Sequence, residues 1–252
     1  MPEAPYGSES LPHLYSYSRR TGRVQLVSRS ATGIGDVDGT AAVSRDGRYV
    51  AFASRSRLSG AATGNADVYL ADRHSGGLAL LTGHLDTPTT GDYLSLSMDD
   101  AAHWLVFCAT DQADPHPKWY VDQLRTGRIV AVDGSPATAA LPVADASIAA
   151  SAPDVIYSGG GDGLTVDPLH ATGGPEQATW FVRNVRTGAV REVAAGPDPQ
   201  RALSCFTRSP PDLPPTLSPE ATRVVVVTGR PLASEDNDCE YDLYLARTGV
   251  GR

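Results

Sequence analysis

Three histidines and several carboxylates lie in polar segments between the apolar runs of this sequence. The histidines are His84, His116 and His170, and Asp86 and Asp114 lie close to the first two of them. Imidazole and carboxylate groups commonly transfer protons near neutral pH, and histidine is a frequent zinc ligand. These five residues are the catalytic candidates. No HxH or HxxxH pair brings two histidines together locally, so their convergence depends on the fold.

A second group of oxygen-bearing side chains lies in the segment SEDNDCE near the C-terminal end. Asp236, Asn237 and Asp238 offer the oxygen ligands that Ca²⁺ prefers, and Ca²⁺ is the one cofactor that the sequence suggests. Their spacing does not match an EF-hand loop, which needs a glycine and a distal glutamate. The alternative is structural, because Asp and Asn stabilise turns by bonding to nearby backbone amides. We expect most loop acids to have this structural role.

Composition and motif content argue against several other classes of protein. The sequence has no GxSxG, P-loop or dinucleotide motif, and SGGGDGL at 158–164 lacks the lysine of a phosphate-binding loop. The net charge is −8 and Lys118 is the single lysine, so we expect no nucleic-acid partner. Apolar runs such as 224–227 are far too short to span a membrane.

The N-terminal segment and the cysteines leave the compartment open. MPEAPYGSESLPH lacks the charged and apolar regions of a signal peptide. This fits a secreted, extracytoplasmic bacterial chain whose leader is absent, and a cytoplasmic protein is the alternative. Cys108 lies in WLVFCAT and is expected in the core, whereas Cys205 and Cys239 lie in loops that could form one disulfide.

The elements that must position these residues are repeated strand–turn–strand units. The pattern occurs in SYSRRTGRVQLVS (16–28), LADRHSGGLALLT (70–82), VDQLRTGRIVAVD (121–133) and VRNVRTGAVREVA (182–194), and each copy is typical of a β-hairpin. The turn glycines recur at intervals of about 50 to 60 residues, a period that indicates a propeller or a similar array. They are Gly22, Gly76, Gly127, Gly188 and Gly249.

A second pattern precedes each complete hairpin and adds two strands to the unit. AAVSRDGRYVAFAS is the clearest copy: a short strand ending in serine, a polar turn, and then a more apolar strand. The four strands, a to d, predict an all-β fold, a β-propeller of four-stranded antiparallel blades. Because strand b is apolar throughout, it should be packed on both faces. We expect one domain, 1–252, with four to five blades and a ring that can be incomplete. Its units are 13–28 (half), 39–82, 92–133, 145–195 and 215–249 (lacking the last strand).

Residues 44–82 resemble the WD40-like (PD40) repeat of the TolB-type β-propellers. The residues in register with that repeat are Ser44, Asp46, Gly47, Phe52, Ser54, Asn65, Asp67, Val68, Tyr69, Asp72 and Gly76. The copy at 218–249 retains part of the pattern, whereas 98–100 and 152–154 replace the DG turn in the two middle copies. The resemblance implies a propeller. It says little about activity, because this fold serves binding proteins, scaffolds and enzymes.

The links between strands differ in length, and this difference predicts where function lies. The a–b and c–d links are short, whereas the b–c and d–a links are long and unlike one another. Both long links should emerge on one face, near the central channel, and long loops on a rigid scaffold commonly carry function. We predict a protein, peptide or small-molecule ligand on this face, with Ca²⁺ as a candidate aid to binding. The alternative is a lyase, hydrolase or cyclase that uses the histidines and aspartates above.

The two ends of the repeat array raise the question of ring closure. An unaccompanied c–d hairpin at 13–28 precedes the first full unit, and the last unit has strands a, b and c. If Tyr15 and Tyr244 share a sheet, the ring closes through these segments. If they do not, we expect that the natural protein continues beyond this segment or that the incomplete blades pair with another chain, including by self-association, because unpaired sheet edges readily pair with other chains.

Overall fold

The computed structural model describes residues 12–31, 33–60, 62, 66–83, 96–109, 118–132, 143–159, 179–194, 215–228 and 242–249. These residues form strands β1 to β17, arranged in antiparallel sheets. The described residues include no helix, and hence no helical segment that could cross a bilayer.

The strands belong to five sheets, which we name the N-terminal hairpin and blades 1 to 4. The hairpin contains β1 (Tyr15–Tyr17) and β2 (Val24–Leu26). Blade 1 contains β3 (Asp38–Val43), β4 (Tyr49–Ser54), β5 (Asp67–Asp72) and β6 (Gly77–Leu80). Blade 2 contains β7 (Leu96–Met98), β8 (Trp104–Ala109), β9 (Lys118–Gln123) and β10 (Arg128–Ala131). Blade 3 contains β11 (Val143–Ile148), β12 (Asp154–Gly159), β13 (Thr179–Asn184) and β14 (Val190–Ala194). Blade 4 contains β15 (Thr216–Leu217), β16 (Arg223–Thr228) and β17 (Asp242–Arg247).

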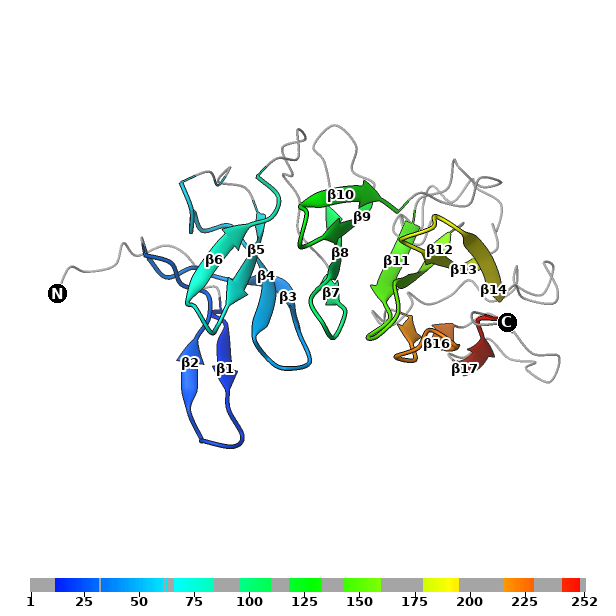
Figure 1. Ribbon diagram of the computed structural model, residues 1–252, viewed down its shortest axis with the longest axis horizontal. Coiled ribbons are helices and arrows are strands. Elements are labelled where there is room, and N and C mark those ends of the chain that lie inside the picture. The colour runs from blue at the N-terminus through cyan, green and yellow to red at the C-terminus, as the bar shows by residue number, and fades with distance from the viewer. Residues whose placement is uncertain are drawn as a thin grey trace, which may run out of the picture.

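The sheets follow one another along an arc, with the hairpin and blade 4 at its two ends (Figure 1). The predicted class, a propeller of four-stranded antiparallel blades, is therefore confirmed. Tyr15 lies in the hairpin and Tyr244 lies in blade 4, and no strand pairing among the described residues joins these two sheets. The arc is an open one in this part of the chain.

Each blade has a front face, turned toward the preceding sheet, and a rear face, turned toward the following one. The alternation of side chains along a strand produces the two faces. Ala53 and Val68 on the rear face of blade 1 pack in one cluster with Leu105 and Phe107 on the front face of blade 2. The same arrangement joins blade 2 to blade 3 and blade 3 to blade 4, whereas the front face of blade 1 packs on Leu14 and Val27, which flank the hairpin strands. Because strand b contributes to both faces, it is buried as predicted, and Val50–Ser54 of β4 is buried throughout.

A stacked aromatic pair fills the front face of each complete blade. The ring centroids are 5.8 Å apart for Phe52 and Tyr69, 5.5 Å for Phe107 and Tyr120, and 5.6 Å for Tyr157 and Phe181. Each pair joins residues that lie directly opposite on strands b and c. Such pairs contribute beyond the area that they bury. In blade 4, Val226 lies opposite Tyr244 at this position.

The short a–b turns connect successive blades by a chain of backbone hydrogen bonds. Arg45 N donates to Asp100 O at 3.0 Å, and Asp100 N donates to Ala150 O at 2.6 Å. Ser151 N then donates to Pro219 O at 2.9 Å. The inner a strands are also in contact from blade to blade, as in the 3.1 Å bond from Ile148 N to Ser97 Oγ. The inside of the arc is therefore held by polar contacts as well as by apolar packing.

The a–b turn of blade 2, where the repeat motif is degenerate, has the same kind of hydrogen bonds as the a–b turns of blades 1 and 4 but is built from different residues. Ser44 Oγ accepts a hydrogen bond from Tyr49 N at 2.9 Å, and Ser218 Oγ has the same role in blade 4. In blade 2, Asp99 Oδ1 accepts from the backbone N–H groups of His103 and Trp104, both at 2.7 Å. A carboxylate oxygen thus replaces the serine hydroxyl, so the loss of the sequence motif does not change the turn.

The predicted c–d turn glycines all have left-handed backbone angles. Their φ values are 66° at Gly22, 76° at Gly76, 65° at Gly127, 76° at Gly188 and 69° at Gly249. This region favours glycine because it has no Cβ. The last copy differs in register: β5 ends at Asp72, four residues before Gly76, whereas β17 ends at Arg247, two residues before Gly249.

Candidate functional site

The blades have two ends, which we name the short-turn end (a–b and c–d links) and the long-loop end (b–c and d–a links). The sequence places every candidate site residue at the long-loop end. The catalytic candidates His84, His116, His170, Asp86 and Asp114 lie outside the described residues. The calcium candidates Asp236, Asn237 and Asp238 also lie outside them. Both sets remain predictions.

One described part of the long-loop end is the region where the link before β3 meets the link after β4. Asp36 is the centre of this cluster. Its Oδ1 accepts hydrogen bonds from Ser54 Oγ at 3.2 Å and from Ser56 Oγ. Asp36 N also donates to Ser56 Oγ at 3.2 Å, and Ser56 N donates to Ser54 Oγ at 3.1 Å. One carboxylate therefore ties two long links together.

A buried tyrosine on strand c also binds the b–c link. The Tyr69 hydroxyl donates to Ser56 O at 3.1 Å and accepts from Leu58 N at 3.3 Å. Burial raises the pKa of this phenol above its usual value, and the hydrogen bond from Leu58 N acts in the opposite direction. The hydroxyl is therefore protonated at neutral pH and serves as a clamp. Gly35 permits the close approach of the two links, since a Cβ there would lie 2.7 Å from Leu58 Cδ1.

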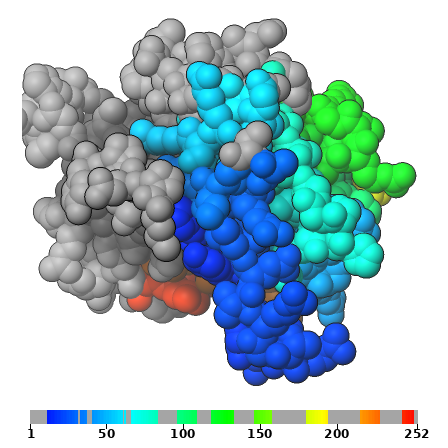
Figure 2. Space-filling view, turned by 90° about the vertical axis from the view of Figure 1, so that its left-hand side faces the viewer, coloured from blue at the N-terminus to red at the C-terminus, as the bar shows by residue number. Residues whose placement is uncertain are grey.

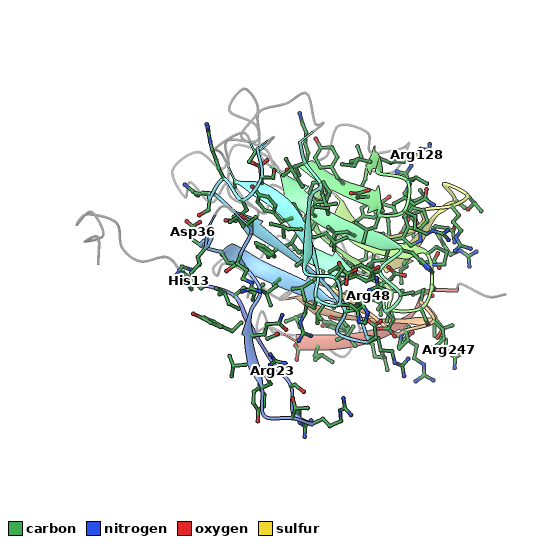
Figure 3. All side chains as sticks on the ribbon, turned by 60° about the vertical axis from the view of Figure 1, so that its left-hand side comes forward. His13, Arg23, Asp36, Arg48, Arg128 and Arg247 are labelled. Atoms are coloured by element: carbon green, nitrogen blue, oxygen red, sulfur yellow. The ribbon has the colours of Figure 1, made fainter. Side chains whose placement is uncertain are left out.

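His13 is a site residue that the sequence did not single out. Its Nδ1 lies 2.9 Å from Gly35 O, so the imidazole N–H donates to this carbonyl and fastens the segment before β1 to the link before β3. His13 and Asp36 lie near each other on one side of the molecule (Figure 3). Neither the spacing of His13 nor its neighbours in the sequence signals this contact, because Gly35 is distant in the chain.

The hydrogen bonds of Asp36 join two links of the chain, which is a structural role. Hydroxyl donors occupy one carboxylate oxygen, and one of these donors, Ser56, belongs to the link that Tyr69 holds in place. Among the described residues, no group of three or more His, Cys, Asp or Glu side chains is placed to hold a metal ion. Asp36 is thus one of the loop acids with the structural role expected for most of them.

Asp67 at the start of β5, one of the residues in register with the repeat, also has a structural role. Its carboxylate is buried and accepts a hydrogen bond from Thr82 Oγ1 at 2.9 Å. Thr82 Oγ1 in turn accepts from Val68 N at 3.1 Å. The buried pair fixes the entry of the chain into strand c and its exit from strand d.

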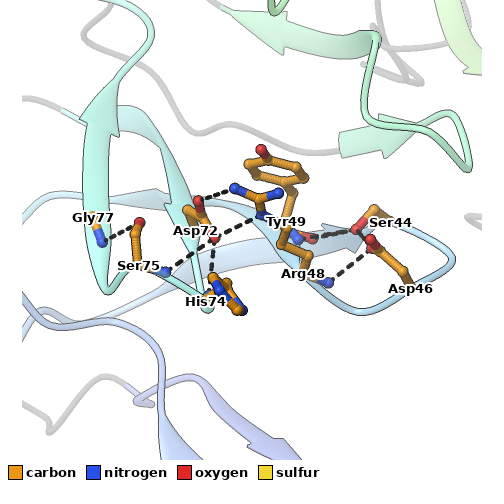
Figure 4. A network of polar contacts seen from close by, with 8 residues as sticks. All are labelled: Ser44, Asp46, Arg48, Tyr49, Asp72, His74, Ser75 and Gly77. Atoms are coloured by element: carbon orange, nitrogen blue, oxygen red, sulfur yellow. Dashed lines mark hydrogen bonds and ion pairs between the residues drawn. The ribbon is translucent and has the colours of Figure 1, made fainter.

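The short-turn end of blade 1 carries a network of charged and polar groups (Figure 4). Arg48 forms two parallel hydrogen bonds to Asp72, from Nε at 3.0 Å and from NH2 at 2.8 Å. Asp72 also accepts from the backbone N–H of His74 at 2.9 Å. The Arg48 guanidinium, together with the backbone amides of His74 and Ser75, holds the pKa of Asp72 well below its usual range. Asp46 has a lowered pKa because the backbone N–H of Arg48 and the hydroxyl of Ser44 bond to it.

This network predicts acid sensitivity at the short-turn end. A carboxyl group with a depressed folded-state pKa stabilises the protein above its unfolded pKa and loses that contribution as the pH falls. Asp72→Asn should therefore lower the free energy of unfolding at pH 7, and the difference from wild type should shrink as the pH drops below about 4. Urea unfolding at several pH values between about 3 and 7 measures this difference.

The control for this prediction is Glu220→Gln, which removes an exposed carboxylate of another short turn. Its effect on stability should be small and should vary little with pH. The free energy of unfolding of the variant is subtracted from that of wild type at each pH. This subtraction is needed because burial raises the pKa of Asp154, so that Asp154 affects the stability of both proteins in the opposite sense as the pH falls. An Asp72→Asn effect that stays constant down to pH 3 would contradict the prediction.

Charge is distributed unequally between the two ends of the blades. Arg48, Arg128 and Arg247 lie away from the side that holds Asp36 and His13 (Figure 3). The arginines in or beside the short turns outnumber the acids there, and the net charge of the chain is −8, so the remainder of the chain is strongly acidic. These arginines are Arg19, Arg20, Arg23, Arg45, Arg48, Arg73, Arg125, Arg128, Arg186, Arg223 and Arg247. The acids are Asp46, Asp72, Asp99, Asp100, Asp154 and Glu220.

Comparison with known proteins supports the fold and leaves activity open. No family model matches the sequence, and no curated protein matches it. Among solved structures, TolB from Acinetobacter baumannii is similar with a TM-score of 0.54 and 16% identity, over 94% of this chain and 46% of that one. The β-propeller domain of the Trilobed protease from Pyrococcus furiosus, described as having an open velcro topology, has a TM-score of 0.55 and 7% identity. That match covers 92% of this chain and 60% of the other.

A third similar structure is an enzyme, an oligogalacturonate lyase in complex with manganese. It has a TM-score of 0.53 and 13% identity, over 92% of this chain and 52% of the lyase. The chain thus spans less than two thirds of each of these three proteins. At such low identity the likeness concerns the fold, which also serves different activities. Within that limit the resemblance seen in the repeat at 44–82 is confirmed: the chain has the β-propeller fold of the TolB structures.

Proposed function

We propose that this chain is a non-catalytic binding propeller whose long-loop end receives a cationic ligand, such as a basic protein segment or peptide. The observation that carries the proposal is the separation of charge and loop length between the two ends of the blades. The short-turn end is held together by backbone hydrogen bonds and carries the excess of arginines. The long links carry most of the remaining acids. A surface with one sign of charge favours ligands of the opposite sign and speeds their association.

The described contacts show how a rigid base could support such a surface. Asp36, Ser56 and Tyr69 fasten two long links of blade 1 to the sheet beneath them. Aromatic pairs and apolar clusters fix each blade against the next. Loops that stand on a rigid scaffold bind with a smaller loss of conformational entropy than loops that must first be ordered.

Calcium is part of this proposal through the segment around Asp236, Asn237 and Asp238. These side chains supply the hard oxygen ligands that suit Ca²⁺. A bound Ca²⁺ would either join the oxygen ligands of the b–c link of blade 4 or bridge to an anionic group of a ligand. The enzyme alternative, with His84, His116, His170, Asp86 and Asp114, stays a prediction, and so does an extracytoplasmic location.

Binding to charged model peptides tests the proposal. Wild-type protein should bind an immobilised lysine-rich peptide and should not bind a glutamate-rich peptide of equal length. Raising NaCl from about 0.05 M to about 0.5 M should weaken the binding, because exposed charges are screened. D236N/D238N should reduce the affinity about three- to ten-fold, since each lost charge near the ligand is worth a fraction of a kcal/mol to about 1 kcal/mol.

A matched control removes two negative charges at a different place. E192Q/E220Q changes two exposed acids that lie outside the long links, and it should leave the affinity unchanged. Equal weakening by both double variants would show a response to net charge alone and would overturn the assignment to the long-loop end. The same proteins are melted with about 2 mM CaCl₂ or with EDTA. A calcium-dependent rise in Tm that D236N/D238N abolishes supports the calcium site.

A further inference from the structure

Exposed apolar side chains in the described structure are concentrated on the two end sheets. Large hydrophobic residues that remain exposed include Tyr15, Tyr17 and Val24 in the N-terminal hairpin, and Leu243 and Leu245 in blade 4. Contiguous apolar surface of this kind is uncommon on a soluble protein unless another surface covers it. The interior blades show what usually covers these positions.

The rear face of blade 4 is the first of these surfaces. Leu243 and Leu245 are 68% and 63% exposed, and they lie opposite Val227 and Val225 on β16. The position of Leu243 is occupied by Val68, Trp119 and Trp180 in the preceding blades. All three of those residues are buried in clusters on the blades' rear faces. Blade 4 therefore presents the same kind of face without a sheet of the described structure packed on it.

The front face of the hairpin is the second surface. Tyr15 and Tyr17 are 57% and 64% exposed, and they lie opposite Leu26 and Val24 on β2. The same register occurs in blade 1, where Tyr69 and Ala71 lie opposite Leu80 and Leu78. In blade 1 this face packs on the hairpin residue Val27 and on Leu14. The hairpin thus presents an apolar front face on which no sheet of the described residues packs. Figure 2 shows the tip of the hairpin projecting from the body of the molecule.

The outer strand of each end sheet also has a single neighbouring strand among the described residues. Strand c has two neighbours in blades 1 to 3, whereas β17 pairs with β16 alone. The second strand of the hairpin, β2, pairs with β1 alone. Exposed edges of this kind commonly pair with another chain.

We propose that two copies of this chain join end to end, with the rear face of blade 4 of one copy against the front face of the N-terminal hairpin of the other. The contact continues, between molecules, the rule that the three interfaces between blades follow within the molecule: a rear face packs on a front face. Each copy has one surface of each kind, so the contact is heterologous and assembles chains or rings larger than a dimer. This inference is independent of the ligand proposed above.

The arginines at the short-turn end determine the conditions for the test. Arg223 and Arg247 lie directly opposite each other on the blade 4 surface, and Arg19 and Arg23 lie beside the hairpin turn. Because these like charges oppose the contact at low salt, the association should strengthen as NaCl increases. Measurements at about 0.5 M NaCl screen the repulsion and leave the apolar contact.

The test is the oligomeric state of wild type and of two surface variants. L243K/L245K blocks the rear surface, and Y15K/Y17K blocks the front surface. All four side chains are exposed, so both variants should fold, and their circular dichroism and melting curves are checked against wild type. Light scattering and sedimentation of wild type at about 10 to 200 µM should show a mass that rises above the 26.5 kDa of one chain. Each variant alone should remain at one chain.

Mixing the two variants distinguishes this contact from others. L243K/L245K retains a good front surface and Y15K/Y17K retains a good rear surface, so an equimolar mixture should form particles of two chains and none larger. The control Ile34→Lys, at an exposed apolar residue of a loop, should assemble like wild type.

Three outcomes would overturn the proposal. Wild type that remains a single chain at the highest concentration shows that neither end surface recruits a second copy. Continued self-association of Y15K/Y17K alone shows a symmetric contact between two blade 4 surfaces instead. A mixture that stays monomeric, with both variants folded, shows that the rear and front surfaces do not bind each other.

Discussion

Replacing Phe107 by alanine should lower the free energy of unfolding by about 3 to 5 kcal/mol. Phe107 is fully buried on the front face of blade 2. Its ring stacks on Tyr120 at 5.5 Å between centroids and packs in one cluster with Ala53 and Val68 of blade 1. The truncation removes the aromatic contact and leaves a cavity between two blades that are connected in several places, so the cavity cannot collapse easily.

Urea unfolding followed by tryptophan fluorescence measures this effect. Phe107→Leu is the matched control, because it keeps most of the buried volume and should cost less than about 1.5 kcal/mol. If Phe107→Ala costs no more than Phe107→Leu, the two blades do not pack as the structure shows. Since adjacent sheets in a repeat array stabilise each other, the loss of stability should affect both blades, and they should unfold in one transition.

Replacing Thr82 by valine should lower the free energy of unfolding by about 2 to 4 kcal/mol, although the two side chains have nearly the same shape. The valine cannot accept the hydrogen bond of Val68 N, nor donate to the buried carboxylate of Asp67. Two buried polar groups would each lose a partner, and each loss costs about 1 to 3 kcal/mol. The effect is larger than the loss of one hydrogen bond because no water replaces the lost partner at a buried site.

Thr82→Ser separates the role of the hydroxyl from that of the methyl group. The serine keeps both hydrogen bonds and should cost less than about 1.5 kcal/mol. Thr21→Val serves as a second control, since Thr21 is an exposed turn residue and its replacement should change stability by about 0.5 kcal/mol or less. Equal stability of Thr82→Val and Thr82→Ser would show that the buried network does not hold strands c and d together.

The binding and the assembly proposals complement each other physically. In a head-to-tail assembly that continues the propeller arrangement, successive copies would present several long-loop ends. Several acidic surfaces in one particle would bind a cationic polymer or a clustered protein partner more tightly than one copy, because the second contact forms at a high effective concentration. The charge and the assembly are nevertheless tested by different variants, so either proposal can fail without the other.

The Asp36 cluster illustrates what residue type alone can and cannot say about a site. The sequence marks Asp36 as an acid in a long link, and the same description applies to Asp86 and Asp114. The structure shows that Ser54 and Ser56 supply donors to Asp36, which makes it a structural anchor. These partners lie at and just after the end of β4, 18 and 20 residues away in the sequence, and no local sequence pattern predicts the contact. The roles of the remaining loop acids depend in the same way on partners that residue type does not reveal.

The repeat pattern predicted the strands and turns because their causes are local. Alternating and continuous apolar runs produced strands such as β4 and β8, and glycine at positions such as Gly76 and Gly127 produced the left-handed turns. Even the degenerate turn of blade 2 formed, since Asp99 can accept the same backbone hydrogen bonds as a serine. The predicted burial of strand b also followed from composition alone.

Tertiary structure alone decided which surfaces remain open. By itself, the sequence determined an all-β propeller with complete and incomplete blades, because hairpin periodicity and turn chemistry act over a few residues. It did not determine whether Tyr15 and Tyr244 meet, since closure depends on the sum of the angles between successive sheets. It could not show that Leu243 and Leu245 are exposed while Val68 is buried, because their strands read alike. Burial depends on which sheet comes next in space, and that is a property of the whole arc.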